Sequence, residues 1–391
     1  MSTGARATPT RHHAGPAIKV GAVLSLSGPF AAHGRQAQRG LALWAEDTNA
    51  AGGLVVRDRG GQWPVALVIY DDASRAAQAT AAAEKLLGDG RVDLLIGPYS
   101  SMLTLAVAPV AERHGKVLWN HGGASDAAAR PGFRSVVSLL SPASHYFVAL
   151  LELVRTRDPT ARRVALLHGA RGTFPQAVRA GAAAYSRRHG LQVVLQRPYP
   201  PPGAGFASLV AHVSACQPDI ILGVGLTEAD LACARALTAP PVRARAVGLV
   251  AAALRVFGQT LGCAARGFLG PSQWEPGLRY QPDLGPTAAE FAARFQARFQ
   301  TESEYPAAQA YAAGLVVQHC VEVAGTLRDE VLLKAAHALR VTTLYGAFRL
   351  DALTGEQVGH RLVVVQWQDE GKRIVWPPAL AEATAQIPLL P

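Results

Sequence analysis

The amino-acid sequence predicts an α/β protein built from two similar lobes, each with a parallel sheet. From residue 18 onward, short β-branched runs alternate with longer alanine-rich stretches of helical period, which is the α/β pattern. The pattern starts a second time after Ser141-Pro142. The chain has 391 residues, of which 49% are apolar and only 17% charged, and it is therefore long enough for two to three domains with ordinary cores.

The first lobe is expected to contain four strands with helices between them. Between residues 36 and 49, Ala37, Leu41, Trp44 and Thr48 fall on one stripe, as an amphipathic helix requires. The expected strands are 18–26, 65–70, 92–96 and 117–119, and the expected helices are 36–49, 75–87 and 103–114. These spacings supply the dozen or so residues that a crossover between parallel strands needs.

A second series of the same kind follows, and the last third of the chain is expected to complete both lobes. The second series has expected strands at 163–167, 191–195, 219–222 and 245–247, and expected helices at 174–189, 206–215 and 228–237. Two further helices, 288–299 and 307–323, need a sheet to cover, and segments 346–350, 361–367 and 374–376 indicate a β tail. The simplest arrangement returns the helices to the first lobe and the tail to the second.

Charge, hydropathy and motifs exclude several classes of function. The formal net charge is +10, but no basic run exceeds two residues, which argues against nucleic-acid binding. No apolar run reaches the ~18 to 20 residues that cross a bilayer, so stable membrane insertion is not expected. HExxH, GxSxG, P-loop and complete GxGxxG motifs are absent from the sequence. We therefore expect neither an enzyme nor a bound cofactor or metal.

The sequence leaves the cellular compartment open. The spacing of the four cysteines fits neither a paired-CxxC zinc site nor a dense disulfide framework. Residues 1–17 are polar and basic without an apolar segment, so they are expected to be disordered and not to act as a secretion signal. Either a signal has been removed from this chain, or the protein stays in the cytoplasm.

Small and hydroxyl-bearing residues follow the expected strands 92–96 and 117–119. In open parallel sheets, ligands lie beyond the carboxyl ends of the strands, where helix N-termini expose N–H groups. Ser100 or Ser101 falls at such a helix start and could hold a carboxylate, although a plain N-cap is the alternative. Gly122-Gly123 allows close approach of a ligand or simply forms a turn. His121, in the same loop, is either a hydrogen-bond donor to a ligand or a solvated loop histidine.

Several stretches in order resemble one known family. They are IKVGAVLSLSGPFAAHG from residue 18, DTNAAGGL from 47, VIYDDAS from 68, LLIGPYSS from 94, GGASD from 122, YPAAQAYAAGLVV from 305 and LYGAFRLDALTGEQVGH from 344. Together they resemble the bacterial leucine/isoleucine/valine-binding proteins, which are type 1 periplasmic binding proteins of amino-acid ABC transporters.

The resemblance implies two Rossmann-like lobes that close like a Venus flytrap about three hinge crossings. The crossings are expected near Ser141, residues 271–276 and residues 344–346. The first lobe would then comprise residues 18–141 and 276–345, and the second residues 142–275 and 346–391.

The resemblance also implies which residues bind the ligand. Ser101 matches the family serine that binds the ligand carboxylate, and Gly122 and Ala124 match the residues whose backbone completes that pocket. Phe174, or Thr173 beside it, falls where an aromatic residue of the second lobe closes over the ligand. Two other aromatic residues could stack on the ligand or pack in the core, namely Tyr99 and Trp274.

Two positions depart from the family pattern. The acid that pairs with the α-ammonium group of the ligand falls within residues 248–250, which contain no carboxylate, and the second-lobe tyrosine falls at Leu226. Glu228 either supplies the missing charge or complements the dipole of its helix. If no acid faces the cleft, the ligand is expected to be a carboxylate without an amine.

The predicted function follows from the fold and these residues. We expect an extracytoplasmic solute-binding protein that delivers a small amino-acid-like or other carboxylate-bearing ligand to the permease of an ABC importer. The alternative is a cytoplasmic ligand sensor, similar to the amide-binding regulator of this superfamily, that signals to a protein partner.

Overall fold

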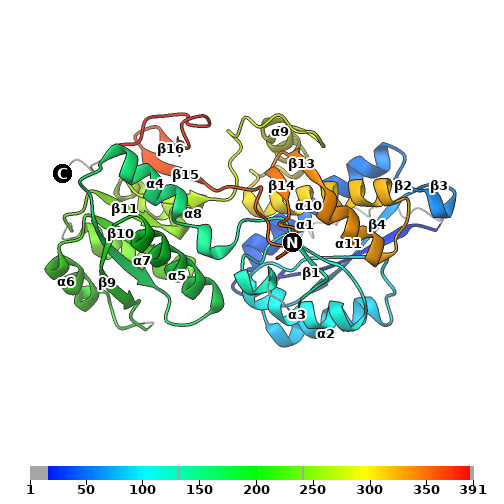
Figure 1. Cartoon of the computed structure of the whole chain (residues 1–391), viewed down its shortest axis with the longest axis horizontal. Coiled ribbons are helices and arrows are strands. Elements are labelled where there is room, and N and C mark those ends of the chain that lie inside the picture. Colours follow the sequence, from blue (N-terminus) through cyan, green and yellow to red (C-terminus); the bar gives the residue numbers. More distant parts are fainter. Residues whose placement is uncertain (1–15, 130–132, 202, 240–241, 388–391) are drawn as a thin grey trace, which may run out of the picture.

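The computed structural model describes residues 16–387 apart from 130–132, 202 and 240–241. Its ribbon shows two lobes side by side along the longest axis (Figure 1). One lobe holds the blue and cyan segments together with the yellow helices, and the other holds the green segments with the red end of the chain. The expected disordered segment 1–17 lies outside the described residues except for its last two. The predicted α/β class with parallel-sheet lobes is confirmed.

The first lobe contains a five-stranded parallel sheet in the order β4-β1-β5-β6-β7. Its strands are β1 (Ile18–Leu24), β4 (Val65–Asp71), β5 (Leu94–Ile96), β6 (Leu118–Asn120) and β7 (Val136–Ser138). Alternate residues face opposite sides: Val20 and Ala22 pack in one core cluster, whereas Val23 packs in another. Both faces of the sheet are therefore buried.

Helices cover both faces of this sheet. They are α1 (Ala31–Ala50), α2 (Ala76–Leu87), α3 (Ser101–Arg113) and α10 (Tyr305–Ala324). The residues of α2 and α3 pack with Val23, and those of α1 and α10 pack with Val20. Sequence periodicity did not identify β7 or the small hairpin of β2 (Leu54–Val56) and β3 (Gly61–Trp63). Each has only three residues, which is too short for an alternating pattern to show.

The second lobe contains a seven-stranded sheet in the order β16-β15-β12-β11-β10-β8-β9. The strands are β8 (Arg163–His168), β9 (Gln192–Pro198), β10 (Ile220–Val224), β11 (Ala246–Leu249), β12 (Leu269–Ser272), β15 (Val363–Gln368) and β16 (Gly371–Trp376). β15 and β16 pair antiparallel, and the other five strands are parallel. The helices are α4 (Val148–Arg157), α5 (Thr173–Arg188), α6 (Ala207–Cys216), α7 (Thr227–Thr238) and α8 (Arg255–Leu261). Of these elements, β12, α4 and α8 were not expected.

The last third of the chain serves both lobes. Helix α9 (Ala288–Phe299) has the predicted bounds, and α10 packs along α1. Helix α11 (Asp329–Ala338) packs on α10 and leads into a hairpin of β13 (Arg340–Thr343) and β14 (Gly346–Arg349). β14 was expected to begin the tail with β15, but it pairs only with β13 among the described strands. The expected boundary between residues 345 and 346 therefore passes through the turn of this hairpin.

The chain passes between the two large sheets three times, and buried hydrogen bonds connect the passages. They lie between β7 and β8, between β12 and α9, and between β14 and β15. The Ser141 hydroxyl lies 2.7 Å from His360 Nδ1, and His360 Nε2 lies 3.0 Å from the Gln273 carbonyl oxygen. The Tyr345 hydroxyl donates to Gln273 Oε1 at 2.7 Å. One buried network thus connects all three passages.

We expect Gly314→Ala to lower the free energy of unfolding by about 1 to 3 kcal/mol, because a methyl group there overpacks the contact between α1 and α10. A Cβ at Gly314 would lie 2.2 Å from the Trp44 ring. Gly61→Ala is the matched control, since a Cβ there meets no atom within 4 Å. Urea unfolding of both variants measures the effect, and equal stabilities would contradict this packing.

Candidate ligand-binding site

Two adjacent serines at the start of α3 have different surroundings. Ser100 is the N-cap: its hydroxyl accepts from the Leu103 N–H at 3.5 Å, and its own N–H donates to the Gly122 carbonyl at 3.1 Å. Ser101 is the first helical residue and is only 4% exposed. Its buried hydroxyl has no hydrogen-bond partner among the described residues. The structure therefore assigns the capping role to Ser100 and leaves the Ser101 hydroxyl for another partner.

The loop after β6 packs against the start of α3 and is organised by one asparagine. Asn120 Oδ1 accepts from the N–H groups of Gly122 at 3.2 Å and Gly123 at 2.8 Å, and Asn120 Nδ2 donates to the Gly123 carbonyl at 2.8 Å. A Cβ at Gly122 would lie 2.8 Å from the Tyr99 Cα, so this approach requires glycine. Both backbone groups of Gly122 already have partners, which makes Gly122 a positioning residue.

Ala124 differs from Gly122 in having an available donor. Its carbonyl accepts from the Ala143 N–H at 2.7 Å, but its own N–H has no partner in the described part of the chain. Its side chain is buried. The N–H of Ser101 is likewise without a protein acceptor among described residues, as expected in the first turn of a helix. Two N–H groups and one hydroxyl at the carboxyl edge of the sheet are the chemistry that a carboxylate requires.

Aromatic rings border this edge of the sheet. Tyr99 stacks on His33 with ring centroids 4.6 Å apart, and its hydroxyl lies 2.5 Å from the hydroxyl of Tyr305 at the start of α10. Burial lowers the pKa of His33 to about 4, and His33 Nδ1 is buried without a partner among described residues. The sequence analysis did not identify His33 or Tyr305. His33 lies in α1, the helix that follows β1, and Tyr305 begins α10; no local pattern marked either as a binding residue.

The structure corrects one alternative for His121. A solvated loop histidine was considered, but His121 is fully buried. Neither ring nitrogen has a partner among the residues described, and burial lowers the pKa of the ring to about 4. A neutral imidazole remains, which can donate one hydrogen bond and accept another.

The second lobe contributes Phe174, the second residue of α5. Its ring meets Tyr146 edge to face at 4.9 Å, and α5 contacts α3 of the first lobe. Phe174 is half-buried. The structure thus places an aromatic residue of the second lobe close to the helix that begins at Ser101.

Leu226 and Glu228 are exposed, whereas Trp274 is buried. Leu226 is 64% exposed at the N-cap of α7, and Glu228 is exposed in the first turn of that helix, where an acid complements the helix dipole. Trp274 is 2% exposed, and its Nε1 donates to the Leu344 carbonyl at 3.1 Å. Trp274 therefore packs in the core, and it is also one of the residues that line the hollow described next.

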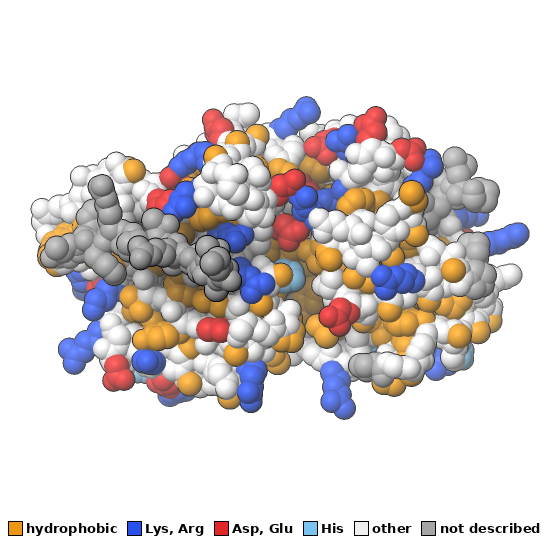
Figure 2. All heavy atoms as spheres, turned by 180° about the vertical axis from the view of Figure 1, so that it is seen from behind, with side chains coloured by type: hydrophobic (Ala, Val, Ile, Leu, Met, Phe, Trp, Pro, Cys, Tyr) orange, Lys and Arg blue, Asp and Glu red, His pale blue; other side chains and the backbone are white. Residues whose placement is uncertain are grey.

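A hollow of about 510 Å³, here called the interlobe pocket, lies between the lobes. Its lining residues come from the first lobe, the second lobe and the β12–α9 passage: Ala253, Leu254, Arg255, Gly258, Gln259, Trp274, Glu275, Pro276, Glu302, Ser303, Glu304, Tyr305, Trp367 and Lys372. Figure 2 shows the surface hollowed between the two halves, with charged side chains gathered beside the hollow. Residues 248–250 carry no acid, but three glutamates line this pocket. Sequence spacing gave no signal for them.

Glu304 differs from Glu275 and Glu302 in having no ion-pair partner among the described side chains. Burial raises the pKa of its carboxyl group, and the charges of Lys372 and Arg255 act in the opposite direction. No cationic side chain in the described part of the chain forms an ion pair with it.

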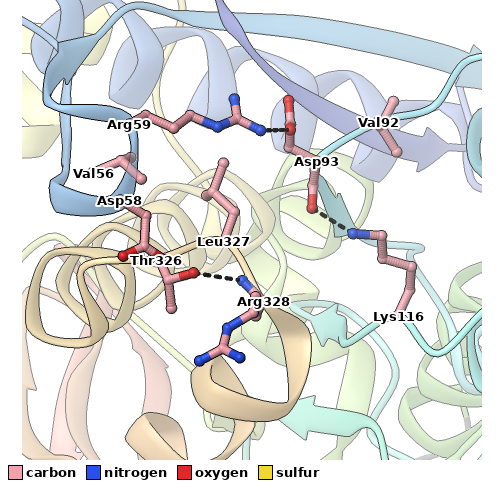
Figure 3. Close-up of a pocket in the computed structure, with 9 residues that line it drawn as sticks. All are labelled: Val56, Asp58, Arg59, Val92, Asp93, Lys116, Thr326, Leu327 and Arg328. Atoms are coloured by element: carbon pink, nitrogen blue, oxygen red, sulfur yellow. Dashed lines mark hydrogen bonds and ion pairs between the residues drawn. The ribbon is translucent and has the colours of Figure 1, made fainter.

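A second hollow of about 350 Å³ lies at the opposite edge of the first sheet (Figure 3). Among its charged groups, Arg59 pairs with Asp93 at 2.8 Å, and Lys116 donates to the Asp93 carbonyl at 2.9 Å. Lys116 also pairs with Asp329, outside the lining, at 2.8 Å. Asp93 and Lys116 precede β5 and β6, so this hollow lies at the amino ends of the strands. Ligands of parallel sheets bind at the carboxyl ends.

Other chemistry is limited in the described residues. No group of three or more His, Cys, Asp or Glu side chains there is placed to hold a metal ion, and all four cysteines are free. Among described helices, none has the length and apolar character to cross a membrane.

The two-lobed α/β fold, with parallel sheets and hydrogen-bond donors at their carboxyl edges, is that of a type 1 periplasmic binding protein. The chain belongs to the periplasmic binding protein family, whose sequence profile matches residues 17–372. The predicted resemblance to leucine/isoleucine/valine-binding proteins is confirmed.

Individual relatives agree with this family assignment. A Leu/Ile/Val-binding protein homolog 7 of Brucella abortus (strain 2308) is 25% identical over 212 residues, which are 52% of this chain and 51% of the relative. The chain thus spans about half the length of the curated relatives it matches. A leucine-binding protein from Thermotoga maritima has a TM-score of 0.78 at 18% identity, covering 91% of this chain and 97% of that one. A benzoate complex of a solute-binding protein from R. palustris has a TM-score of 0.74 at 19% identity, covering 95% and 99%.

We expect stability to fall in acid because of three buried neutral histidines. Burial lowers the pKa of His33, His121 and His360 from 6.5 to about 4, so the unfolded chain takes up protons before the folded one does. The stability they contribute is fully present above pH 6.5 and is lost as pH falls toward 4, by up to about 1.4 kcal/mol per pH unit for each ring. Urea unfolding at several pH values measures the slope.

A variant pair tests which histidines are responsible. His121→Asn removes one titrating ring and is expected to reduce the slope between about pH 6.5 and 4. The control His212→Asn removes an exposed histidine ring from α6, which separates the loss of a buried ring from the loss of any histidine. An identical slope in both variants would contradict the assignment to buried rings.

Proposed function

We propose that the chain is the extracytoplasmic solute-binding component of an ABC importer and that it binds a small carboxylate ligand between its lobes. The observation that carries the proposal is the buried Ser101 hydroxyl without a protein partner at the N-terminus of α3. A buried hydroxyl that lacks a hydrogen bond costs about 1 to 3 kcal/mol, so a ligand oxygen there recovers that free energy.

The first lobe supplies the carboxylate site. The Ser101 hydroxyl and the N–H groups of Ser101 and Ala124 donate to the carboxylate oxygens, and the positive end of the α3 dipole favours the negative charge. Gly122 and Asn120 hold the loop in place through the bonds described above. Similar solved structures are complexes with isoleucine, benzoate and 3,4-dihydroxybenzoic acid, and all three ligands carry a carboxylate.

The second lobe covers the rest of the ligand. Phe174 supports the apolar part from the first turn of α5, beside α3. Since both lobes contact the ligand only when they are close together, binding favours the closed arrangement. A permease that recognises this arrangement would receive loaded protein selectively.

We expect Ser101→Ala to weaken carboxylate binding by about 1 to 3 kcal/mol, because the ligand loses a buried hydrogen bond. Thermal-shift screening of leucine, isoleucine, benzoate and 3,4-dihydroxybenzoate selects the ligand, since a ligand at 100 times its Kd adds about 2.7 kcal/mol of stability. Calorimetric titration then gives the affinities of wild type and variant.

The matched control is Ser208→Ala, which removes an exposed serine hydroxyl from α6. This control is expected to bind like wild type. Ser101→Ala should leave the unliganded stability at least as high as that of wild type, because it removes a buried hydroxyl that makes no bond within the described protein. Unchanged affinity in Ser101→Ala would remove that residue from the site, and a panel without any binding carboxylate would reject the proposed ligand class.

A further inference from the structure

The interlobe pocket contains one carboxylate, that of Glu304, which forms no ion pair with a cationic side chain in the described part of the chain. Five charged side chains line it. Arg255 of α8 pairs with Glu302 of the first lobe, and Lys372 Nζ pairs with Glu275 Oε1 at 2.8 Å. The remaining charge belongs to Glu304, so the pocket is formally one negative charge in excess. A charge in a partly buried site favours a ligand of the opposite sign.

A second polar group of the same segment also lacks a partner. Ser303 lines the pocket and is 7% exposed, and its buried hydroxyl has no hydrogen-bond partner among the described residues. It can accept a hydrogen bond from a ligand donor. Ser303 and Glu304 both line the pocket, and a hydroxyl and a carboxylate are acceptors that suit an ammonium group with its three donors.

The remaining wall of the pocket is apolar and aromatic. The aromatic residues Trp274, Tyr305 and Trp367 line it together with Leu254. Aromatic faces attract organic cations and also pack on hydrocarbon. The volume of about 510 Å³ is that of a small-molecule site.

We propose that the interlobe pocket binds the ammonium group of an organic amine, with Glu304 as its counter-ion and Ser303 as a hydrogen-bond acceptor. The aromatic rings contact the hydrocarbon part of the amine. Residues of both lobes line the pocket, so an amine bound there favours the arrangement that brings them together. The proposal goes beyond carboxylate binding, since it uses neither Ser101 nor Ala124.

The test compares phenethylamine with 2-phenylethanol, which has nearly the same shape without the charge. In calorimetric titration at neutral pH, wild-type protein is expected to bind phenethylamine at least about tenfold more tightly than the alcohol. Glu304→Gln is expected to weaken phenethylamine binding by about tenfold or more and to leave the alcohol unaffected. Equal affinity for the two probes, or an unchanged affinity in Glu304→Gln, would overturn the proposal.

Two further variants control for indirect effects. Ser303→Ala removes the hydroxyl alone and is expected to weaken phenethylamine binding severalfold. Glu330→Gln removes the same charge from the exposed first turn of α11 and is expected to bind phenethylamine like wild type. If Glu330→Gln weakened binding as much as Glu304→Gln, the loss of affinity would reflect the net charge of the protein and not contact with Glu304. That result would overturn the proposal.

The Ser101→Ala variant separates this proposal from the carboxylate site. It is expected to bind phenethylamine like wild type even if it loses carboxylate ligands, so either proposal can fail alone. Titration of 6-aminohexanoate distinguishes two sources of the ammonium group. Loss of affinity in both Ser101→Ala and Glu304→Gln identifies the ammonium end of a carboxylate ligand, whereas loss in Glu304→Gln alone identifies a separately bound amine.

Discussion

The junction between β5 and α3 is the constraint on which the site depends. The chain must turn from a buried parallel strand directly into a helix, and Ser100 makes that turn with a φ of 84° while capping the helix. The same residue is bonded to Gly122, so the turn and the β6 loop hold each other in place. Because Ser100 satisfies the cap, Ser101 is held in the first turn with its hydroxyl and N–H uncommitted. The donor set at this edge is thus a consequence of how the strand ends.

Two sets of side chains lie where the lobes connect: a buried hydrogen-bond network without charged groups, and the charged residues of the interlobe pocket. The network of Ser141, Gln273, Tyr345 and His360 is buried and contains no charged side chain, and burial lowers the pKa of His360 to about 4. Neutral groups that satisfy each other avoid the large desolvation cost of buried ions. The ion pair of Arg255 with Glu302 lies instead at the more exposed border, where water solvates its charges. Buried neutral hydrogen bonds therefore define where the passages meet, while charged side chains, including the largely buried pair of Glu275 and Lys372, line the pocket.

Most of the fold followed from patterns within short stretches of the chain. The predicted helix 288–299 matches α9, whose Phe291 and Phe295 are fully buried. An apolar stripe at helical spacing predicts both the helix and the face that packs against the core. The prediction was wrong for the strand partner of residues 346–350, because strand pairing joins segments that are separated in the sequence. β14 pairs with β13 and not with the tail, and no periodicity within residues 346–350 distinguishes those partners. The unexpected β7 and β12 are short strands whose existence depends on neighbours in the sheet.

The sequence by itself determined the order of strands and helices, and with it the residues that end up at the carboxyl edge of the first sheet. Hydrophobic periodicity and the geometry of parallel crossovers act locally, so they can be inferred without coordinates. Only the tertiary structure decided that Ser100 caps while Ser101 does not, that His121 is buried, and that Glu304 meets Trp274 and Lys372 in one pocket. Burial and pairing depend on side chains brought together from distant parts of the chain, and the sequence pattern around each residue does not contain that information.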